Sequence, residues 1–375
     1  MANANQVALG RSNLSTGTCY GGATDKYALY LKLFSGEMFK GFQHETIARD
    51  LVTKRTLKNG KSLQFIYTGR MASEFHTPGT PILGNSDKAP PVAEKTIVMD
   101  DLLISSAFVY DLDETLAHYE LRGEISKKIG YALAEKYDRL IFRAITRGAR
   151  SASPVNATSF AEPGGTQIRV GSTTNDSDAY NAGNLVNAFY DAAAALDEKG
   201  VSGQGRCAVL NPRQYYALIQ DIGSNGLVNR DVQGSALQSG NGVIEIAGIH
   251  IYKSMNIPFL GKYGVAYGGS TGETSPSNLG DFIGVTPENA NATGGVNNDY
   301  GTNAELGSKS CGLIFQKEAA GVVEAIGPQV QVTNGDVSVI YQGDVILGRM
   351  AMGADYLNPA AAVELYVGGS APSSF

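Results

Sequence analysis

Apolar residues between positions 114 and 146 recur every three or four positions, which is the spacing of one helix face. The stripe is formed by Leu121, Ile125, Ile129, Leu133, Tyr137, Leu140, Ile141, Ala144 and Ile145. Acidic residues stand at its start, arginines stand near its end and Gly148 follows, as the helix dipole and C-terminal capping favour. We therefore predict an amphipathic helix over residues 114–146, about 50 Å long.

Ahead of this helix the pattern shortens to alternation, which is typical of strands. Ser62–Tyr67 begins to alternate, and the segment Thr96–Tyr110 is rich in Ile, Val, Leu and Phe. Prolines and glycines between the two segments exclude a continuous helix and favour an extended loop. The sequence therefore predicts a long projecting hairpin, in which Leu63–Tyr67 pairs with Thr96–Leu103.

The second half of the chain predicts a mixed arrangement of helices and strands. Apolar residues recur at helical spacing over 185–196 and predict a helix that ends at Gly200. Asn211 is a typical N-cap and Pro212 a typical first residue, so they predict a short helix that ends at Asp221. Strands are expected at Arg206–Leu210, Val243–Ile246, Ile249–Tyr252, Gly264–Tyr267, Gly312–Gln316, Gly321–Val332, Val337–Leu347 and Val363–Val367.

Composition adds long connections to this picture. The chain has 46 Gly in 375 residues without a collagen-like period, so the excess indicates turns and loops. Residues 1–24 have few large apolar side chains and predict a flexible arm, which the amphipathic segment Tyr27–Phe42 follows. Residues 148–178 predict a connection, and residues 268–308 predict a surface loop or a partly disordered segment.

Charge is unevenly divided along the chain. Residues 1–150 hold 20 Lys/Arg and 16 Asp/Glu, whereas residues 151–375 hold 10 and 20, so the two parts carry +4 and −10. The pI near 5.4 argues against a dedicated DNA-binding protein. No secretory signal or membrane-spanning stretch is recognised, so we expect a soluble protein made inside the cell, with no membrane partner.

Motifs of known chemistry are absent or incomplete. Gly268–Gly272 fits G-x-S-x-G around Ser270, but no helix pattern follows and every histidine precedes it. Gly203–Ala208 imitates a dinucleotide fingerprint, yet it leads into a strand rather than a helix. The four His and three Cys lack metal-site spacing. No catalytic residue, cofactor or metal is therefore expected.

A basic strip precedes the predicted hairpin, and three interpretations of it stay open. It consists of Arg49, Lys54, Arg55, Lys58 and Lys61. A solvated surface, a contact with an acidic neighbouring subunit and a contact with DNA phosphates would each accommodate these charges.

Several stretches resemble the major capsid proteins of T7-like short-tailed phages. The most specific run lies within Glu94–Arg122, where Glu-Lys-Thr-Ile-Val-Met-Asp-Asp-Leu-Leu precedes Val-Tyr-Asp-Leu-Asp and His-Tyr-Glu-Leu-Arg. Supporting stretches, in the family's order, are His76–Gly79, Val209–Tyr215, Ile246–Pro258 and Met352–Leu365. The resemblance covers about Tyr27 to Val367 and is weakest at 268–308 and at both ends.

The resemblance implies a mixed α+β chain with the HK97-type capsid fold. That fold has an N-terminal arm, an extended β-hairpin loop, a peripheral domain with a long spine helix, and an axial domain. The corresponding parts here are the arm at 1–57, the loop at 58–105, the peripheral domain at 106–179, the axial domain at 180–310, peripheral return strands at 311–350, and a C-terminal axial strand and tail at 351–375.

The resemblance also implies a function without an active site. The chain would self-assemble through hexamers and pentamers into an icosahedral shell around double-stranded DNA, inside the host cytoplasm, with a scaffolding protein, a portal at one vertex and weak non-specific DNA contact. Candidate inter-subunit contacts are Lys54, Arg55, Lys58, Phe75, His76, Pro78, Ile82 and Arg122. Two alternatives stay open: an encapsulin-type nanocompartment shell and a hydrolase using Ser270.

Overall fold

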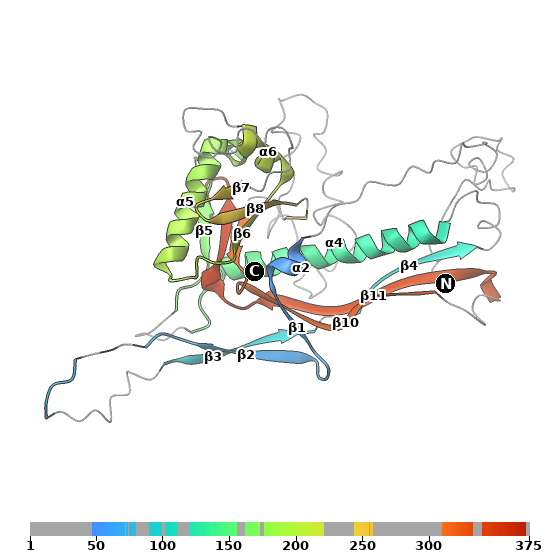
Figure 1. Cartoon of the computed structure of the whole chain (residues 1–375), viewed down its shortest axis with the longest axis horizontal. Helices are drawn as coiled ribbons and strands as arrows, with labels where there is room; N and C mark the ends of the chain where they lie inside the picture. The colour runs from blue at the N-terminus through green and yellow to red at the C-terminus, as the bar shows by residue number, and fades with distance from the viewer. Residues whose placement is uncertain are drawn as a thin grey trace. The chain divides into compact units, whose positions relative to one another are not determined.

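The structure is a computed structural model, shown in Figure 1. It describes residues 47–71, 73, 75–79, 90–99, 102–110, 121–155, 162–172, 176–220, 244–254, 256–257, 310–332 and 340–372. The chain forms two compact units. Unit 1 comprises 1–44, 101–135 and 325–352, and unit 2 comprises 45–100, 136–324 and 353–375.

Unit 1 combines part of a long helix with antiparallel strands. The helix α4 (Leu121–Arg150) is divided between the units, as are the strands β10 (Ala320–Val332) and β11 (Gly343–Tyr356). Strand β4 (Leu103–Tyr110) pairs antiparallel with β11 from Tyr110↔Gly343 to Leu103↔Met350. A Cβ at Gly348 would collide with Ile129 and Leu133 of α4, so glycine lets the helix lie close to this sheet.

Unit 2 is built around a six-stranded sheet of order β5-β12-β9-β6-β8-β7. Its strands are β5 (Thr166–Arg169), β6 (Arg206–Leu210), β7 (Ile244–Ile246), β8 (Ile249–Lys253), β9 (Ser310–Gln316) and β12 (Ala362–Tyr366). All five residues of β6 are buried, as expected for a strand covered on both faces. The apolar core of this sheet also contains buried residues of the helices α5 (Ala182–Glu198) and α6 (Pro212–Gln220). Ala179 of the 3-10 turn η2 (Asp176–Tyr180) belongs to the same core.

Two further parts of unit 2 come from the first hundred residues. Strands β2 (Ser62–Thr68) and β3 (Val92–Val98) form a separate two-stranded antiparallel ribbon, visible in Figure 1. The short helix α2 (Ala48–Leu51) and strand β1 (Thr53–Thr56) precede it. Strand β1 pairs in parallel with the unit 2 portion of β10, from Thr53↔Gly321 to Thr56↔Glu324.

A buried carboxylate fixes the start of this N-terminal segment. Asp138 of α4 is 1% exposed and accepts the backbone N–H groups of Ile47 at 2.9 Å and of Ala48 at 3.1 Å. These N–H groups have no partner within the first turn of α2, so the carboxylate satisfies them. The Asn256 side-chain amide also donates to Asp138, at 3.4 Å. This segment is thereby tied to the second half of α4.

A buried ion pair joins the end of α4 to the six-stranded sheet. Arg150 donates to both carboxylate oxygens of Glu364, at 2.8 and 2.6 Å, and the side chains are 1% and 0% exposed. The Gln167 amide of β5 donates to the same carboxylate at 2.9 Å. This bidentate geometry and the third donor offset part of the cost of burying both charges.

The sequence predictions agree with most of these elements. The mixed α+β composition is confirmed, as are the helix after Asn181, the strand Arg206–Leu210 and the short helix that Asn211 caps. Predictions that lie outside the described residues concern the arm, the segment Tyr27–Phe42, the start of the long helix, the strand Gly264–Tyr267 and the loop 268–308. The domain boundaries drawn from the resemblance stay a prediction.

Four boundaries differ from the predictions. The long helix continues through Gly148 to Arg150, since Gly148 packs against Tyr356 and a Cβ there would be 2.9 Å from its Cβ. The returning segment is two strands: β3 begins at Val92, within the predicted loop, and pairs with β2, whereas Leu103 begins β4, which pairs with β11. Strand β11 begins at Gly343 and continues to Tyr356, because Ile340 and Tyr341 form a helical turn. The connection 148–178 contains β5, which the sequence did not signal.

In the part of the chain that the structure describes, no helix is both long and apolar enough to cross a membrane.

We predict that the substitution Glu364→Leu lowers the free energy of unfolding by about 3–5 kcal/mol, because it leaves Arg150 charged and buried without its partner. Urea unfolding of the unassembled chain measures the change. Adding Arg150→Met to the same variant should recover most of the loss, since the double variant buries no charge at this position. A loss below about 1 kcal/mol in the single variant would contradict this role of the pair.

Candidate functional site

The β2–β3 ribbon has two different faces. The register pairs Leu63 with Ile97, Phe65 with Lys95 and Tyr67 with Ala93, and these side chains are half-buried or, for Ile97, fully buried. Side chains alternate across a strand, so the intervening residues lie on the opposite face. That opposite face is mostly exposed, and the ribbon is therefore covered on one side only.

A charged cluster attaches the covered face to the end of β11. The Lys95 ammonium lies 2.8 Å from an oxygen of Asp355 and 3.5 Å from the centre of the Tyr356 ring. The guanidinium of Arg147 lies 3.8 Å from Asp355 and 5.9 Å from the same ring, close enough for weak attraction. Because Lys95 and Asp355 are both largely buried, solvent screens this ion pair less than a surface pair.

Two more polar contacts hold the first strand of the ribbon and the residues that follow it. The Tyr67 hydroxyl hydrogen-bonds to the side-chain oxygen of Asn358 at 3.0 Å, and burial, followed by the nearby Glu162 charge, raises the pKa of Tyr67. Arg70 donates to Glu162 at 3.3 Å and to the Lys199 backbone carbonyl at the end of α5, at 2.8 Å. A cation near the last carbonyls of a helix is electrostatically favourable.

The Lys199 side chain turns back into the same region of unit 2. Its ammonium donates to the Gly164 carbonyl at 2.6 Å and to the Thr166 hydroxyl. Burial lowers the pKa of Lys199 to about 8. Glu162, Gly164 and Thr166 thus belong to one connected polar region around the end of α5, onto which Arg70 of the hairpin is fastened.

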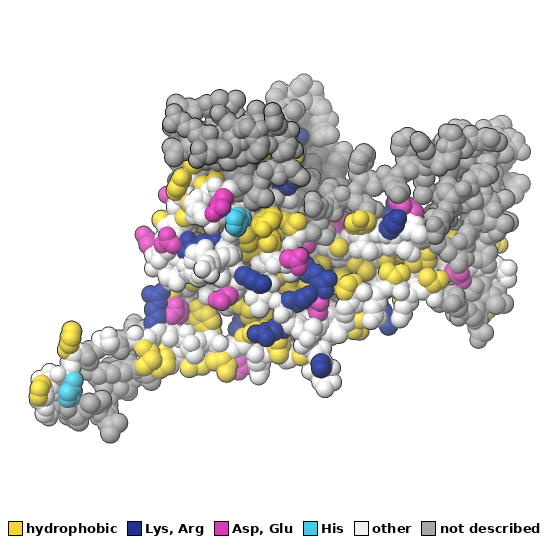
Figure 2. Space-filling model, viewed as in Figure 1, with side chains coloured by type: hydrophobic (Ala, Val, Ile, Leu, Met, Phe, Trp, Pro, Cys, Tyr) yellow, Lys and Arg dark blue, Asp and Glu magenta, His cyan; other side chains and the backbone are white. Residues whose placement is uncertain are grey.

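The uncovered face of the ribbon carries exposed apolar side chains. Ile66 is 78% exposed and Val92 is 63% exposed. Ile66 lies opposite Glu94, and Val92 lies opposite Thr68, so the two apolar side chains are diagonal neighbours on one face. Val98 lies further along the same face and is also exposed. Figure 2 shows apolar side chains interspersed along the ribbon labelled in Figure 1.

The structure describes most of the candidate contact residues at the hairpin tip. Phe75 is fully exposed, and His76 and Pro78 are exposed beside it. Ile82 lies outside the described residues, and Arg122 is placed in α4 although its side chain lies outside the description. A fully exposed phenylalanine is unfavourable in water, which fits a surface that another molecule covers.

The basic strip divides into one paired residue and a set of exposed ones. Arg49 lies 3.2 Å from Glu324, whose other oxygen accepts the Tyr137 hydroxyl at 2.7 Å. The hydrogen bond to Glu324 raises the pKa of Arg49, and burial raises that of Tyr137. Lys54, Arg55, Lys58 and Lys61 are exposed on β1 and the following turn. The strip therefore presents its charge from residues 54–61.

The described cysteines of unit 2 and its described metal-binding residue types form no reactive site. Burial raises the pKa of Cys207 to about 12 and also raises that of Cys311, so both thiols stay protonated. The described residues contain no group of three or more His, Cys, Asp or Glu side chains placed to hold a metal. Ser270 lies outside the description.

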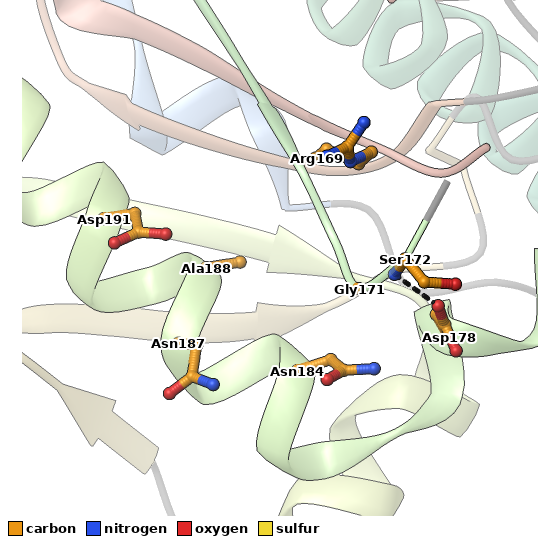
Figure 3. A pocket seen from close by; sticks show the side chains of 8 residues that line it. All are labelled: Arg169, Gly171, Ser172, Asp178, Asn184, Asn187, Ala188 and Asp191. Carbon is orange, nitrogen blue, oxygen red and sulfur yellow. Dashed lines mark hydrogen bonds between the residues drawn. The ribbon is translucent and has the colours of Figure 1, made fainter. Parts of the chain in front are cut away.

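A polar hollow lies beside α5, as Figure 3 shows. It is lined by Arg169, Gly171, Ser172, Asp178, Asn184, Asn187, Ala188 and Asp191. The Asp178 carboxylate accepts the Ser172 backbone N–H at 2.6 Å, and the left-handed conformation of Gly171 brings the turn against Asp178. Asp178 therefore closes a turn here.

Sequence reasoning identified the exposed tip and the basic strip but missed the exposed face of the ribbon. Ile66 was predicted as an ordinary strand residue and Val92 as part of the loop before Thr96, and only their exposure in the structure distinguishes them. The one available signal was the alternation itself, since every second residue of Ser62–Thr68 should face away from the body. The anchors Asp355 and Glu162 are distant in sequence from the hairpin and carried no signal.

Comparisons with known proteins agree on one kind of protein. A family model described as "Gp10A-like: Major capsid protein" matches residues 64–366. The major capsid protein of Escherichia phage T7 is 26% identical over 351 residues, covering 91% of this chain and 92% of that protein. The capsid structure of the cyanophage P-SCSP1u is 31% identical with a TM-score of 0.69, covering 98% of this chain and 100% of the other. A bacteriophage PhiM1 capsid structure, 14% identical with a TM-score of 0.61, shares the fold and covers 94% of this chain and 96% of the other.

We predict that Lys95→Met speeds hydrogen exchange of the β2–β3 amides roughly tenfold, because the ion pair and ring contact together contribute about 1.5 kcal/mol to the attachment of the ribbon. Hydrogen exchange of the unassembled chain, read by mass spectrometry, measures the change. Lys61→Met removes an exposed lysine just before β2 and serves as the control. Equal exchange in the two variants would contradict the anchoring role of Lys95.

Proposed function

Because the chain belongs to the Gp10A-like major capsid protein family, we propose that its copies assemble through hexamers and pentamers into the icosahedral shell that encloses the double-stranded DNA of a T7-like short-tailed phage. The family match spans most of the chain, and the fold is the HK97-type capsid fold. The protein is a structural component of the virion and belongs to a class without enzymatic activity. The copies are proposed to join through defined contacts and to meet a scaffolding protein, a portal and packaged DNA.

The observation that carries the proposal is the one-sided ribbon. Polar contacts hold β2–β3 at Lys95, Tyr67 and Arg70, while Ile66 and Phe75 stay exposed. Burying a large apolar side chain is worth about 1.5–3 kcal/mol, so a second copy that covers these residues gains substantial free energy. The ribbon is held firmly enough to present this surface to a neighbour.

Head-to-tail contacts of this kind use different surfaces on the two partners, so they close into rings. Contacts of millimolar to micromolar affinity would each contribute roughly 4–8 kcal/mol. Several acting together stabilise a shell, while a single incorrect contact can still dissociate. Assembly can therefore correct its errors before the shell closes.

The residues proposed to touch neighbouring subunits fall into two groups. Apolar and aromatic contacts come from Phe75, His76, Pro78 and Ile82 at the hairpin tip, and charged contacts come from Lys54, Arg55, Lys58 and Arg122. The charged group supports contact with the acidic second part of a neighbouring chain, because residues 151–375 carry a net charge of −10. The flexible arm predicted at residues 1–24 is proposed to order in the assembly.

Partners beyond the chain itself follow from the same proposal. A scaffolding protein would guide assembly in the host cytoplasm, and a portal would occupy one vertex. Packaged DNA would touch the shell by weak, non-specific contacts, since strong phosphate binding would oppose its release. The net charge of −6 supports weak contact.

Neither alternative gains a specific observation. An encapsulin-type nanocompartment would use the same fold to enclose cargo enzymes. The matching family, however, is a major capsid protein family, and the similar proteins of phages T7 and T3 are major capsid proteins. A hydrolase would depend on Ser270, which no described residue supports. Negative-stain electron microscopy of the purified chain, with and without a candidate scaffolding protein, tests the proposal directly. Closed shells of uniform diameter are expected, and uniformly small particles under every condition would refute it.

We predict that Phe75→Asp abolishes shell formation or raises the concentration needed for it at least about tenfold, because a charge replaces an apolar contact worth about 1.5–3 kcal/mol. Light scattering against protein concentration, with electron microscopy of the products, measures the effect. Ser73→Asp adds the same charge at an exposed position of the same segment and should assemble normally. Normal shells from Phe75→Asp would remove Phe75 from the contact set.

We also predict that free capsomers bind duplex DNA weakly at physiological salt, with a dissociation constant no tighter than the roughly 10⁻⁴–10⁻⁶ M of non-specific binding. Fluorescence anisotropy over a salt series measures this. Replacing Lys54, Arg55 and Lys58 by glutamine should change the DNA affinity little while weakening assembly. Tight, strongly salt-dependent DNA binding that this triple variant loses would assign the strip to DNA instead.

A further inference from the structure

The first half of α4 presents an exposed face over residues 127–135. The opposite face of the helix packs on β11, because Ile129 and Leu133 are buried and lie where a Cβ at Gly348 would collide with them. Tyr131 lies midway between these two residues in the sequence, so it points to the other side of the helix. Its side chain is 46% exposed. Tyr131 is thus a large aromatic side chain that its own unit leaves uncovered.

Two buried acidic residues limit this face at its two ends. Glu124 and Asp138 lie about two turns before and after Tyr131, and both fall on the same side of the helix. Their exposed fractions are only 8% and 1%. A partner of this face therefore contacts a short part of α4, centred on Tyr131.

The charges of this face have opposite signs at equal distances from Tyr131. Lys127 lies one turn before it and Glu135 lies one turn after it, so the three residues share one side of the helix. Lys128 stands next to Lys127 and is exposed as well, while Glu135 is half-buried. One end of the face is therefore basic and the other end is acidic.

A second copy of the same helix, running antiparallel, complements this arrangement. A two-fold axis beside Tyr131 brings Lys127 and Lys128 of each copy next to Glu135 of the other copy, because both ends are equally far from the axis. The two Tyr131 rings then meet at the axis, and contacts between aromatic rings are favourable. A parallel arrangement would instead place lysines against lysines, which repel each other.

Gly130 fits a close approach of this kind. It lies within α4, where glycine is less favourable than alanine. Among the described residues of its own copy, a Cβ at this position would meet nothing within 4 Å, so packing within the copy does not require glycine. The missing side chain lets a second helix lie close to the backbone beside Tyr131. The glycine thus supports the contact, while the charges determine its direction.

We propose that α4 of one copy packs antiparallel against α4 of a second copy, across a two-fold axis at Tyr131. This inference rests on the proposed shell function, and it assigns the contact to the junction between two rings. Contacts within a ring are head-to-tail and use two different surfaces, whereas this face is complementary to itself, as a two-fold contact requires. A contact of about two helical turns is small, which suits an assembly held by several weak contacts at once.

Other occupants match this face less well than a second copy does. DNA phosphates would attract Lys127 and Lys128, but they would be repelled by Glu135 at the other end. A scaffolding protein would have to bring a matching pair of charges of its own. A second copy of α4 supplies both charges at the required spacing, and its partner gains the same contacts in return.

Disulfide formation in assembled shells tests the position of the axis. The chain carries Tyr131→Cys together with Cys19→Ser, and Cys207 and Cys311 are buried, which keeps them out of the reaction. A residue at a two-fold axis meets its own counterpart, so oxidation should link chains into dimers and into nothing larger. Lys127→Cys is the matched control, because its two copies would lie about 12 Å apart along the helices, too far for a disulfide.

Non-reducing gels of the oxidised shells should show at least about tenfold more dimer from Tyr131→Cys than from Lys127→Cys. Closed shells in which Tyr131→Cys gives no dimer, or in which the control links equally well, overturn the inference and leave the shell function intact. If the unmodified chain forms no shells, the proposed function fails and the inference fails with it.

Charge reversal keeps the test decisive if the cysteine prevents assembly. Lys127→Glu with Lys128→Glu places acidic side chains against Glu135 of the second copy, and it should raise the protein concentration needed for shells at least about tenfold. Adding Glu135→Lys reverses both ends of the face and should restore assembly. A defect that Glu135→Lys does not restore assigns the lysines to a scaffolding protein or to DNA and overturns the inference. Normal assembly of the Lys127→Glu, Lys128→Glu variant overturns it as well.

Discussion

A two-stranded ribbon cannot cover both of its own faces, and much of this structure follows from that constraint. The β2–β3 ribbon buries Ile97 on one side and leaves Ile66 and Val92 in solvent on the other. Its attachment combines the burial of Ile97 with an ion pair, a ring contact and hydrogen bonds. Such an attachment fixes the orientation of the ribbon and leaves the apolar side chains of its uncovered face exposed. A chain whose role is to join copies of itself needs this division between a surface for holding and a surface for binding.

The body that supports the ribbon is stabilised differently. The six-stranded sheet has a continuous apolar core, and the charged side chain of Glu364 is buried in it together with its partner Arg150. Asp138 does the same for the backbone at the start of α2. Breaking any of these groups would leave a charge or an N–H without a partner, so they favour one arrangement of the segments they join. The exposed ribbon is thus mounted on a well-defined base.

The sequence was informative where local chemistry determines structure. The apolar stripe predicted α4, Asn211 predicted the start of α6, and alternation predicted the ribbon. It was uninformative where packing between distant segments decides, as at Gly148, which looked like a helix end but lies within the helix against Tyr356. Strand β5 escaped prediction because four residues carry too little periodicity. The candidate contacts at the tip came from composition and resemblance, whereas the anchors Asp355 and Glu162 required the fold.

The position of β12 in its sheet has a consequence for how the chain is made. This strand follows all other members of the sheet in the sequence, yet it lies between β5 and β9 and contributes Glu364 to the buried ion pair. Strands β5 and β9 therefore have no shared neighbour until residues 362–366 have left the ribosome. The ribbon, by contrast, closes from segments about thirty residues apart and can form early. Synthesis itself thus delays completion of the six-stranded sheet until β12 has been made, which discourages chains that still lack this strand from joining a growing shell.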